Sequence, residues 1–244
     1  LNTNLSELVE DNIFRNNISN IGVSYLKSKF KSYWNSSFKN SITPIQAWET
    51  PAILNKLIQY RVGLNRNMET FDLSLHQIIR GISAARYSIS FFKPLLASSI
   101  YYKFLGNKEM PIVFDPCAGF GGRLLGFKSK YPNGKYIGLE PNIETYNELV
   151  ELAKNFSNVD LYNCKAEDYE LKEEVDLTFT SIPYYDLETY SNPIKYTNFQ
   201  EWKNIFLNKI LSFPNLVLNV PNKLRFEITL PCIEYFIKSN TSHF

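Results

Sequence analysis

The sequence predicts an α/β protein in which a mostly parallel sheet follows a helical amino-terminal region. From Pro111 onward, short β-rich runs alternate with amphipathic helical segments, which is typical of parallel strands joined by crossover helices. Residues 1 to about 85 have helical periodicity instead. The 244 residues are 44% hydrophobic and 20% charged, which is the range of an ordinary globular protein.

Helices are expected throughout the amino-terminal region. The segments LSELVEDNIFRNNI and GVSYLKSKFKSYW carry apolar residues at helical spacing, and a further helix is expected from about Phe71, after TPIQAWETPAILNKLIQYRVG. We therefore divide the chain into a basic helical region at 1–85 and a sheet-containing domain at 86–244.

The sheet-containing domain is expected to have five strands with helices between them. We place the strands at 111–115, 135–140, 158–163, 174–181 and 215–221, and the helices at 121–130, 143–155 and 199–212. Open sheets of this kind bind ligands beyond the carboxyl ends of the strands, where the strand order reverses. The chain ends about 20 residues after NLVLNVPN, so we expect this domain to be incomplete at its carboxyl end.

Composition argues against several classes of protein. The three cysteines, Cys117, Cys164 and Cys232, are far apart in apolar settings, which favours reduced thiols and a cytoplasmic or nucleoid-associated protein. The two histidines, His76 and His243, are too few and too separated for a metal site or a Ser–His pair. Charges interrupt every apolar run before it is long enough to cross a membrane, so neither metal nor membrane is expected.

The net charge of +2 is unevenly distributed. Residues 1–110 hold 13 Lys and Arg against 7 Asp and Glu, whereas residues 111–244 hold 13 against 17. In the segment 25–40, YLKSKFKSYWNSSFKN, lysines alternate with aromatic residues, a mixture suited to phosphate neutralisation and base stacking. An amphipathic helix whose aromatic residues pack inward is the alternative. The lysines expected to contact nucleic acid, with DNA as the expected partner, are Lys27, Lys29 and Lys31.

Three glycines stand close together directly behind the first predicted strand, in FDPCAGFGGRLLG. The pattern from Asp115 is D-x-x-x-G-x-G, and a dinucleotide fingerprint would need a third glycine where Leu124 stands. Glycine permits positive φ and close approach of a ligand. A carboxylate beside such a turn would repel a pyrophosphate and attract a cationic amino group.

The second predicted strand ends in another acid, Glu140. A carboxylate at this place can accept hydrogen bonds from both hydroxyls of a ribose, and Pro141 could cover one face of the attached base. The two strand ends together describe a ligand that has a ribose and an ammonium group but no phosphate. S-adenosylmethionine is such a ligand.

Residues 85–225 resemble the Rossmann-like S-adenosylmethionine-dependent methyltransferases. The resemblance implies that the glycine turn holds the methionine end, that Glu140 binds the ribose, and that Asp168, in CKAEDY, binds the adenine amino group. A helix cap is the alternative for Asp168. The candidate cofactor-binding residues in this part of the chain are Asp115, Pro116, Ala118, Gly119, Gly121, Glu140, Pro141 and Asp168.

The upstream segment YSISFFKPLLASSIYYKFL (87–105) resembles the F-x-P-x-[LV]-A-x-x-[IM] segment of adenine amino-methyltransferases. Five residues match this form: Phe92, Pro94, Leu96, Ala97 and Ile100. The resemblance implies that the segment closes over the methionine end, with Pro94 opening a helix. Phe92 and Pro94 are therefore also candidate cofactor-binding residues.

The segment TFTSIPYYDLETYS, behind the fourth strand, resembles the [DNS]-P-P-[YFW] motif of enzymes that methylate adenine N6 or cytosine N4. Ser181, Pro183 and Tyr184 match, and Ile182 replaces the first proline. An exocyclic amine is a poor nucleophile because its lone pair is delocalised, so acceptors must localise that pair by binding the amine hydrogens. The motif implies that the Ser181 side chain and the Ile182 carbonyl do so, while Tyr184 stacks on a flipped base. A plain loop is the alternative.

These features predict methyl transfer from S-adenosylmethionine to an exocyclic amine of a nucleobase in DNA, with the target base left open. A second interpretation is methylation of RNA or of a protein glutamine. A third is a non-catalytic, cofactor-binding subunit, which is suggested by Ile182 and by the incomplete sheet.

Overall fold

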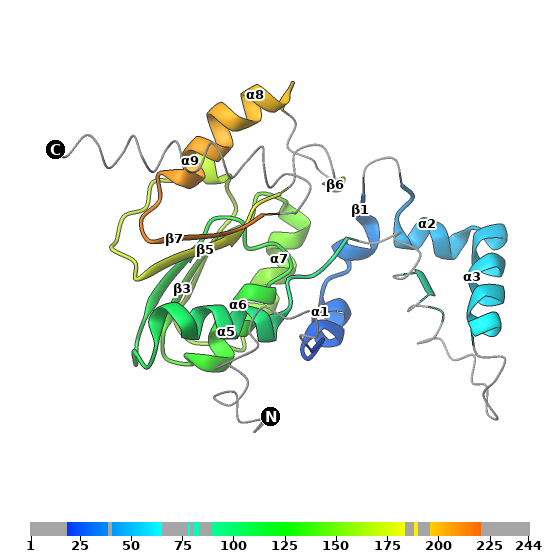
Figure 1. Ribbon diagram of the computed structural model, residues 1–244, viewed down its shortest axis with the longest axis horizontal. Coiled ribbons are helices and arrows are strands. Elements are labelled where there is room, and N and C mark those ends of the chain that lie inside the picture. The colour runs from blue at the N-terminus through cyan, green and yellow to red at the C-terminus, as the bar shows by residue number, and fades with distance from the viewer. Residues whose placement is uncertain are drawn as a thin grey trace. The chain divides into compact units, whose positions relative to one another are not determined.

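The computed structural model describes residues 19–38, 41–64, 78, 81–82, 89–183, 188–189 and 196–220 (Figure 1). The helix expected at 5–18 and nearly all of the segment expected from Phe71 to residue 85 lie outside these ranges. The chain forms two compact units. Among the described residues, the first unit contains 19–29, 91–183 and 196–220, and the second contains the others. None of the helices in the described ranges has the length and apolar character that a bilayer span requires.

The first unit is built on a parallel sheet of the Rossmann-like α/β type. Its described strands follow the order β4-β3-β2-β5-β7, and every neighbouring pair is parallel. Their bounds are β2 Ile112–Asp115, β3 Lys135–Leu139, β4 Val159–Tyr162, β5 Leu177–Ser181 and β7 Leu216–Asn219. The five strands expected from the sequence, and the fold class, are confirmed.

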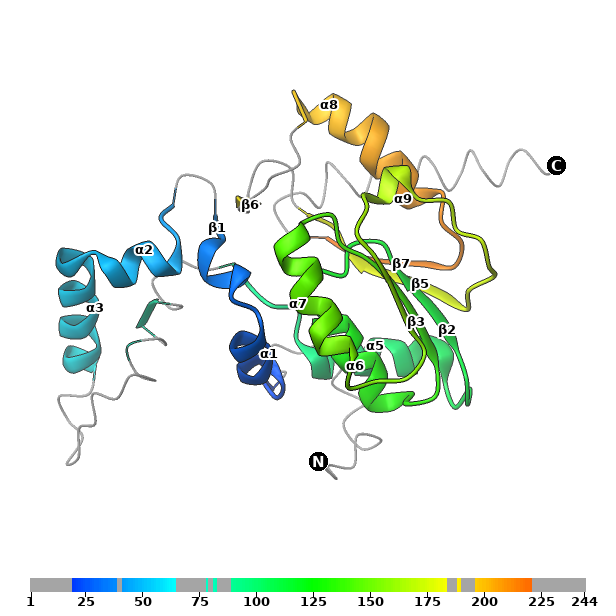
Figure 2. The same ribbon diagram turned by 180° about the vertical axis from the view of Figure 1, so that it is seen from behind.

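Helices cover both faces of this sheet. On one face lie α6 (Gly122–Lys130) and α7 (Ile143–Ala153), and on the other lies a continuous helix formed by α8 (Phe199–Trp202), the π-helical turn η3 (Lys203–Leu207) and α9 (Asn208–Leu211). Figures 1 and 2 show the two groups on opposite sides of the strands. Crossover connections between parallel strands are right-handed. The strand order runs outward from β2 in one direction and from β5 in the other, so right-handed connections place the helices of the two halves on opposite faces. The order therefore reverses between β2 and β5.

The core of the first unit is packed with aromatic rings between α5 (Pro94–Leu105), α6 and the sheet. The ring centroid of Tyr101 lies 5.1 Å from that of Phe127 and 5.2 Å from that of Phe179. A Cβ on Gly126 would lie 2.4 Å from the Pro94 carbonyl oxygen, so α5 and α6 pack at backbone distance. Pro94 is the first residue of α5, as the sequence predicted.

The second unit contains α2 (Pro44–Glu49), α3 (Pro51–Leu64), the 3₁₀ turn η1 (Ser32–Asn35), and a two-stranded pair of β1 (Ser37–Phe38) with β6 (Glu188–Thr189). A capping box between Thr43 and Gln46 starts α2. The segment 43–63 forms two helices, because Pro51 lacks the donor that would continue α2 and instead opens α3.

The two units do not divide the chain at residue 85. The helix α1 (Val23–Lys29) belongs to the unit that contains the sheet, whereas β6 belongs to the second unit. The single helix expected over 22–34 is also interrupted, since α1 ends at Lys29 and η1 starts at Ser32. The sequence pattern does not reveal these long-range associations, because both depend on residues far apart in the chain.

Candidate functional site

The glycine turn connects β2 to α6, and two kinds of constraint explain its glycines. Gly119 and Gly121 have φ of 54° and 71°, the left-handed region that costs other residues conformational strain. Gly122 has another reason, because a Cβ there would lie 2.1 Å from the carbonyl oxygen of Phe92. The upstream segment is therefore packed directly against the turn, and its closure over the methionine end of a cofactor stays a prediction.

Asp115 ends β2 and is fully buried, with four hydrogen bonds from the protein itself. Its Oδ1 accepts from the Cys117 N–H at 3.2 Å and from Thr180 Oγ1 at 2.9 Å. Its Oδ2 accepts from Arg123 Nε and from the Tyr136 hydroxyl, both at 2.7 Å. A carboxylate has about four acceptor positions. None is left for the ammonium group of a ligand.

Arg123 balances the charge of Asp115 inside the protein. Its side chain is 5% exposed, it also donates to the Cys117 carbonyl, and its guanidinium lies 5.2 Å from the centroid of the Phe92 ring. Burial alone would lower the pKa of Arg123, but the Asp115 carboxylate outweighs it and the pKa is raised. The expectation that Asp115 attracts a cationic ligand group is therefore replaced by a role in fixing the turn.

Glu140 follows β3 and retains acceptor capacity. It is 9% exposed, and its Oε2 accepts from the Gly119 N–H at 3.0 Å while its Oε1 accepts from the Asn142 N–H at 2.8 Å. One acceptor position on each oxygen remains, which matches two adjacent ribose hydroxyls. Burial outweighs these two hydrogen bonds and raises the pKa of Glu140 to about 7.

The other predicted cofactor residues lie at the same edge of the sheet. Ala118 is buried and its N–H donates to the Leu139 carbonyl at 2.8 Å. The Asn163 amide donates to the carbonyls of Glu140 and Pro141 at 2.9 and 3.1 Å. Two further predicted residues complete this edge, the buried Pro116 in the turn and the exposed Asp168 at the end of η2 (Ala166–Asp168).

The target motif begins where β5 ends. Ser181 is the last residue of β5, the Ile182 side chain is 2% exposed and Pro183 is half-buried. Tyr184 lies outside the described residues. The Ser181 Oγ accepts a hydrogen bond of 2.9 Å from Asn219 Nδ2, at the end of β7.

Four residues that donate hydrogen bonds to Asp115 or Ser181 are missing from the sequence-based prediction. Arg123 lies on a helix, where a charged residue is usually exposed to solvent. Tyr136 and Thr180 are residue types that are common in strands, so the sequence pattern does not single them out. Asn219 carries no motif. Its only signal is its position at a strand end, and its pairing with Ser181 follows from the β5–β7 register.

Two aromatic residues of the basic segment 25–40 pack inward, whereas Tyr25 is 41% exposed. Phe30 and Tyr33 are 0% and 1% exposed, so they are not available to stack on bases, and the alternative interpretation holds for them. Lys29 is exposed, with Nζ 5.4 Å from the centroid of the Tyr25 ring. Phosphate binding by Lys27, Lys29 and Lys31 stays a prediction.

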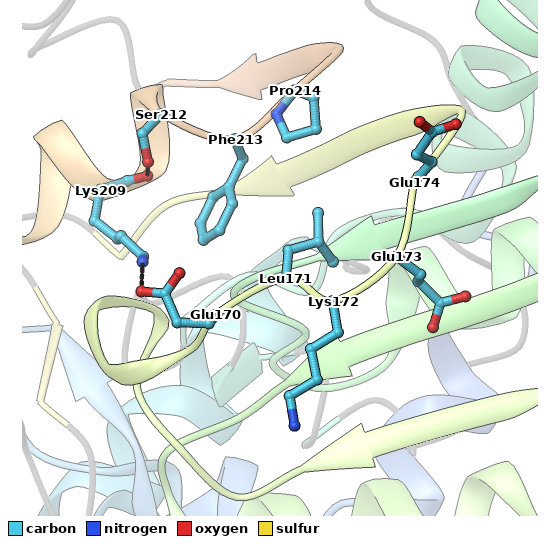
Figure 3. Close-up of a pocket in the computed structure, with 9 residues that line it drawn as sticks. All are labelled: Glu170, Leu171, Lys172, Glu173, Glu174, Lys209, Ser212, Phe213 and Pro214. Carbon is cyan, nitrogen blue, oxygen red and sulfur yellow. Dashed lines mark hydrogen bonds and ion pairs between the residues drawn. The ribbon is translucent and has the colours of Figure 1, made fainter.

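A shallow cavity of about 450 Å³ lies elsewhere on the first unit (Figure 3). Its walls come from residues 170–174, which precede β5, and from the residues that precede β7. Figure 3 shows the ion pair of Lys209 with Glu170, 2.9 Å long, beside Phe213 and Leu171. This cavity is at the amino ends of β5 and β7, whereas Ser181 and Asn219 are at their carboxyl ends. Within the described ranges, no cluster of His, Cys, Asp and Glu could hold a metal ion.

No family model and no curated protein matches the chain. Solved structures that are similar to it include an S-adenosylmethionine-dependent O-methyltransferase from Thermotoga maritima, 14% identical, with a TM-score of 0.45 over 60% of this chain and 51% of that chain. A proposed RNA methyltransferase from Pyrococcus horikoshii is 17% identical, with a TM-score of 0.43 over 58% and 67%. Coclaurine N-methyltransferase, bound to N-methylheliamine and S-adenosylhomocysteine, is 14% identical, with a TM-score of 0.38 over 80% and 49%. The chain thus spans about half to two thirds of the length of these proteins.

Proposed function

We propose that the chain transfers the methyl group of S-adenosylmethionine to an exocyclic amine of a nucleobase in DNA. The observation that carries this proposal is the 2.9 Å hydrogen bond from Thr180 Oγ1 to Asp115 Oδ1. It joins the strand end that leads into the glycine turn to the strand end that leads into the Ser181 motif. The two motifs are therefore neighbours at the reversal of strand order, where open α/β sheets bind ligands.

The residues around the turn fit the ribose of the cofactor. Glu140 keeps an acceptor position on each oxygen, and its Oε2 is tied to the Gly119 N–H, so the ribose site and the turn form one structure. The turn between Asp115 and Gly122 would hold the methionine end. When bound, S-adenosylmethionine supplies an electrophilic methyl group on its sulfonium.

The residues of the target motif would prepare the amine. Ser181 Oγ and the Ile182 carbonyl would accept the two amine hydrogens and so localise the nitrogen lone pair, and Tyr184 would stack on the extruded base. The Ile182 side chain is buried in the protein interior. Isoleucine in place of the first proline of the motif therefore changes the buried side chain but keeps the backbone carbonyl that would accept the amine hydrogen. The amine becomes acidic as it is methylated, so no strong base is required.

Transfer of label tests the proposal and its alternatives. The protein is incubated with S-adenosylmethionine labelled in its methyl group and with unmethylated duplex DNA, folded RNA or a protein mixture. We expect label in DNA, in N6-methyladenine or N4-methylcytosine after digestion to nucleosides, and a much slower but measurable transfer with the Ser181→Ala variant, which keeps the Ile182 carbonyl. Label in RNA or protein alone would favour the second interpretation. Cofactor binding without transfer to any of the three would favour the non-catalytic subunit.

A further inference from the structure

The ends of β5 and β7 carry a side-chain contact that the sequence motifs do not include. Asn219 Nδ2 donates to Ser181 Oγ at 2.9 Å, and the two residues are paired across the strands. Both side chains are half-buried, so they remain accessible to a ligand. We propose that Asn219 is a positioning residue, which holds the Ser181 oxygen in the orientation that accepts an amine hydrogen of the substrate. This inference rests on the proposed function.

Ser181 needs such a partner because the serine side chain can rotate about its Cα–Cβ bond. A hydroxyl on Cβ has three staggered positions, and only one can face a given substrate hydrogen. The contact with Asn219 selects one of them before the substrate binds. Preorganised acceptors of this kind act without reorganisation during the reaction.

The contact also determines which parts of the hydroxyl remain for the substrate. The Asn219 N–H occupies one of the two lone pairs of Ser181 Oγ, so one lone pair and the hydroxyl proton are left. The remaining lone pair can accept one amine hydrogen. The other amine hydrogen would go to the Ile182 carbonyl, so the two acceptors are adjacent in the chain.

The contact is not needed to hold the two strands together. The β5–β7 ladder already pairs four residues in sequence, from Thr178 with Leu216 to Ser181 with Asn219. Replacing the Asn219 side chain should therefore leave the sheet intact. This separates a positioning role from a purely structural one.

The test combines single and double substitutions on the full chain. Asn219→Leu has nearly the same size but no donor, Asn219→Asp keeps a polar partner for the Ser181 hydroxyl, and the exposed Asn204→Leu is the matched control. We measure kcat and KM for DNA with labelled cofactor, the cofactor Kd by calorimetry, and the thermal midpoint. Losing one oriented hydrogen bond should lower kcat of Asn219→Leu about tenfold. The cofactor Kd and thermal midpoint should stay close to wild type, and Asn219→Asp should recover most of kcat.

The double variant decides whether Asn219 acts through Ser181. If it does, Asn219→Leu combined with Ser181→Ala should be no slower than Ser181→Ala alone. Losses that multiply would overturn the positioning role, as would an unchanged kcat in Asn219→Leu. A wild-type chain that transfers no label to any substrate would overturn the proposed function, and the inference with it. An active wild type with an unaffected Asn219→Leu would overturn the inference alone.

Discussion

Cofactor binding should depend on pH through Glu140, since this acid is the predicted ribose ligand. Its pKa of about 7 means that about one tenth of the side chain is ionised at pH 6 and about nine tenths at pH 8. Ribose hydroxyls donate to the carboxylate form. The affinity for S-adenosylhomocysteine should therefore rise roughly tenfold between pH 6 and pH 8.

The stability of the free protein should change in the opposite direction. Folding raises the pKa of Glu140 from 4.5 to about 7, so the folded state binds this proton more tightly than the unfolded state does. The resulting stabilisation is fully present below pH 4.5 and is lost as the pH rises through 7. As the pH rises, the cofactor affinity should therefore increase while the thermal midpoint decreases. These opposite slopes against pH distinguish titration of a ligand-binding group from general unfolding, which would lower both.

Calorimetry in buffers of different ionisation enthalpy measures the proton directly. At pH 6.5, about three quarters of a proton should be released from Glu140 for each cofactor bound. The side chain of Glu140→Gln cannot titrate, so the protons released from Glu140 should be absent in this variant. Subtracting the proton release of the variant from that of the wild type also removes the protons that come from the ligand. Glu151→Gln is the control, since Glu151 is an exposed acid paired with Lys154. Equal proton release by wild type and Glu140→Gln would refute the assignment.

Three further predictions concern the buried network and the basic segment. Thr180→Val should lower the free energy of unfolding by about 1.5 to 3 kcal/mol, because Asp115 loses a donor. Thr178→Val removes a buried hydroxyl on the same strand that has no hydrogen-bond partner among the described residues, so it should be neutral or stabilising. Chemical denaturation compares the two variants, and equal losses would contradict this account. Arg123→Met should lower the free energy of unfolding by about 3 to 5 kcal/mol, because it leaves the buried Asp115 carboxylate uncompensated. Adding Asp115→Asn should recover part of this loss in the same assay. The third variant replaces Lys27, Lys29 and Lys31, the predicted phosphate ligands, with Gln. It should reduce the slope of log K for DNA binding against log salt by about one per lost contact. An unchanged slope, measured by fluorescence anisotropy, would remove these lysines from the DNA site.

The parallel sheet could be predicted because its information is local. Strand β3, for example, is a short β-rich run followed by a helix with its own start signal, Asn142, which caps α7. The glycine turn is also local, since left-handed backbone at Gly119 and Gly121 requires glycine within a few residues of the strand. Local patterns do not predict the break between α1 and η1, because the helical periodicity of 22–34 continues through it.

The electrostatic state of the site could not be predicted, because it depends on contacts between distant residues. Asp115 receives hydrogen bonds from Thr180, 65 positions away, and from Tyr136, 21 positions away. Sequence alone treats Asp115 and Glu140 as equivalent acids at strand ends. Only the folded chain shows that one is saturated by protein donors, while the other keeps acceptor positions and a raised pKa.

This difference between the two acids assigns them separate tasks. Asp115 links the ends of β2 and β5 through Thr180, the residue next to Ser181, and Ser181 is linked in turn to Asn219 on β7. A run made of these two hydrogen bonds and the peptide bond between Thr180 and Ser181 thus connects the turn to the target motif across three strands. Because Asp115 is held in place by Arg123, the distance between the proposed cofactor site and the Ser181 oxygen would be set before either ligand binds. Glu140 stands outside this run, so its titration should affect cofactor affinity more than the rate of the bound complex.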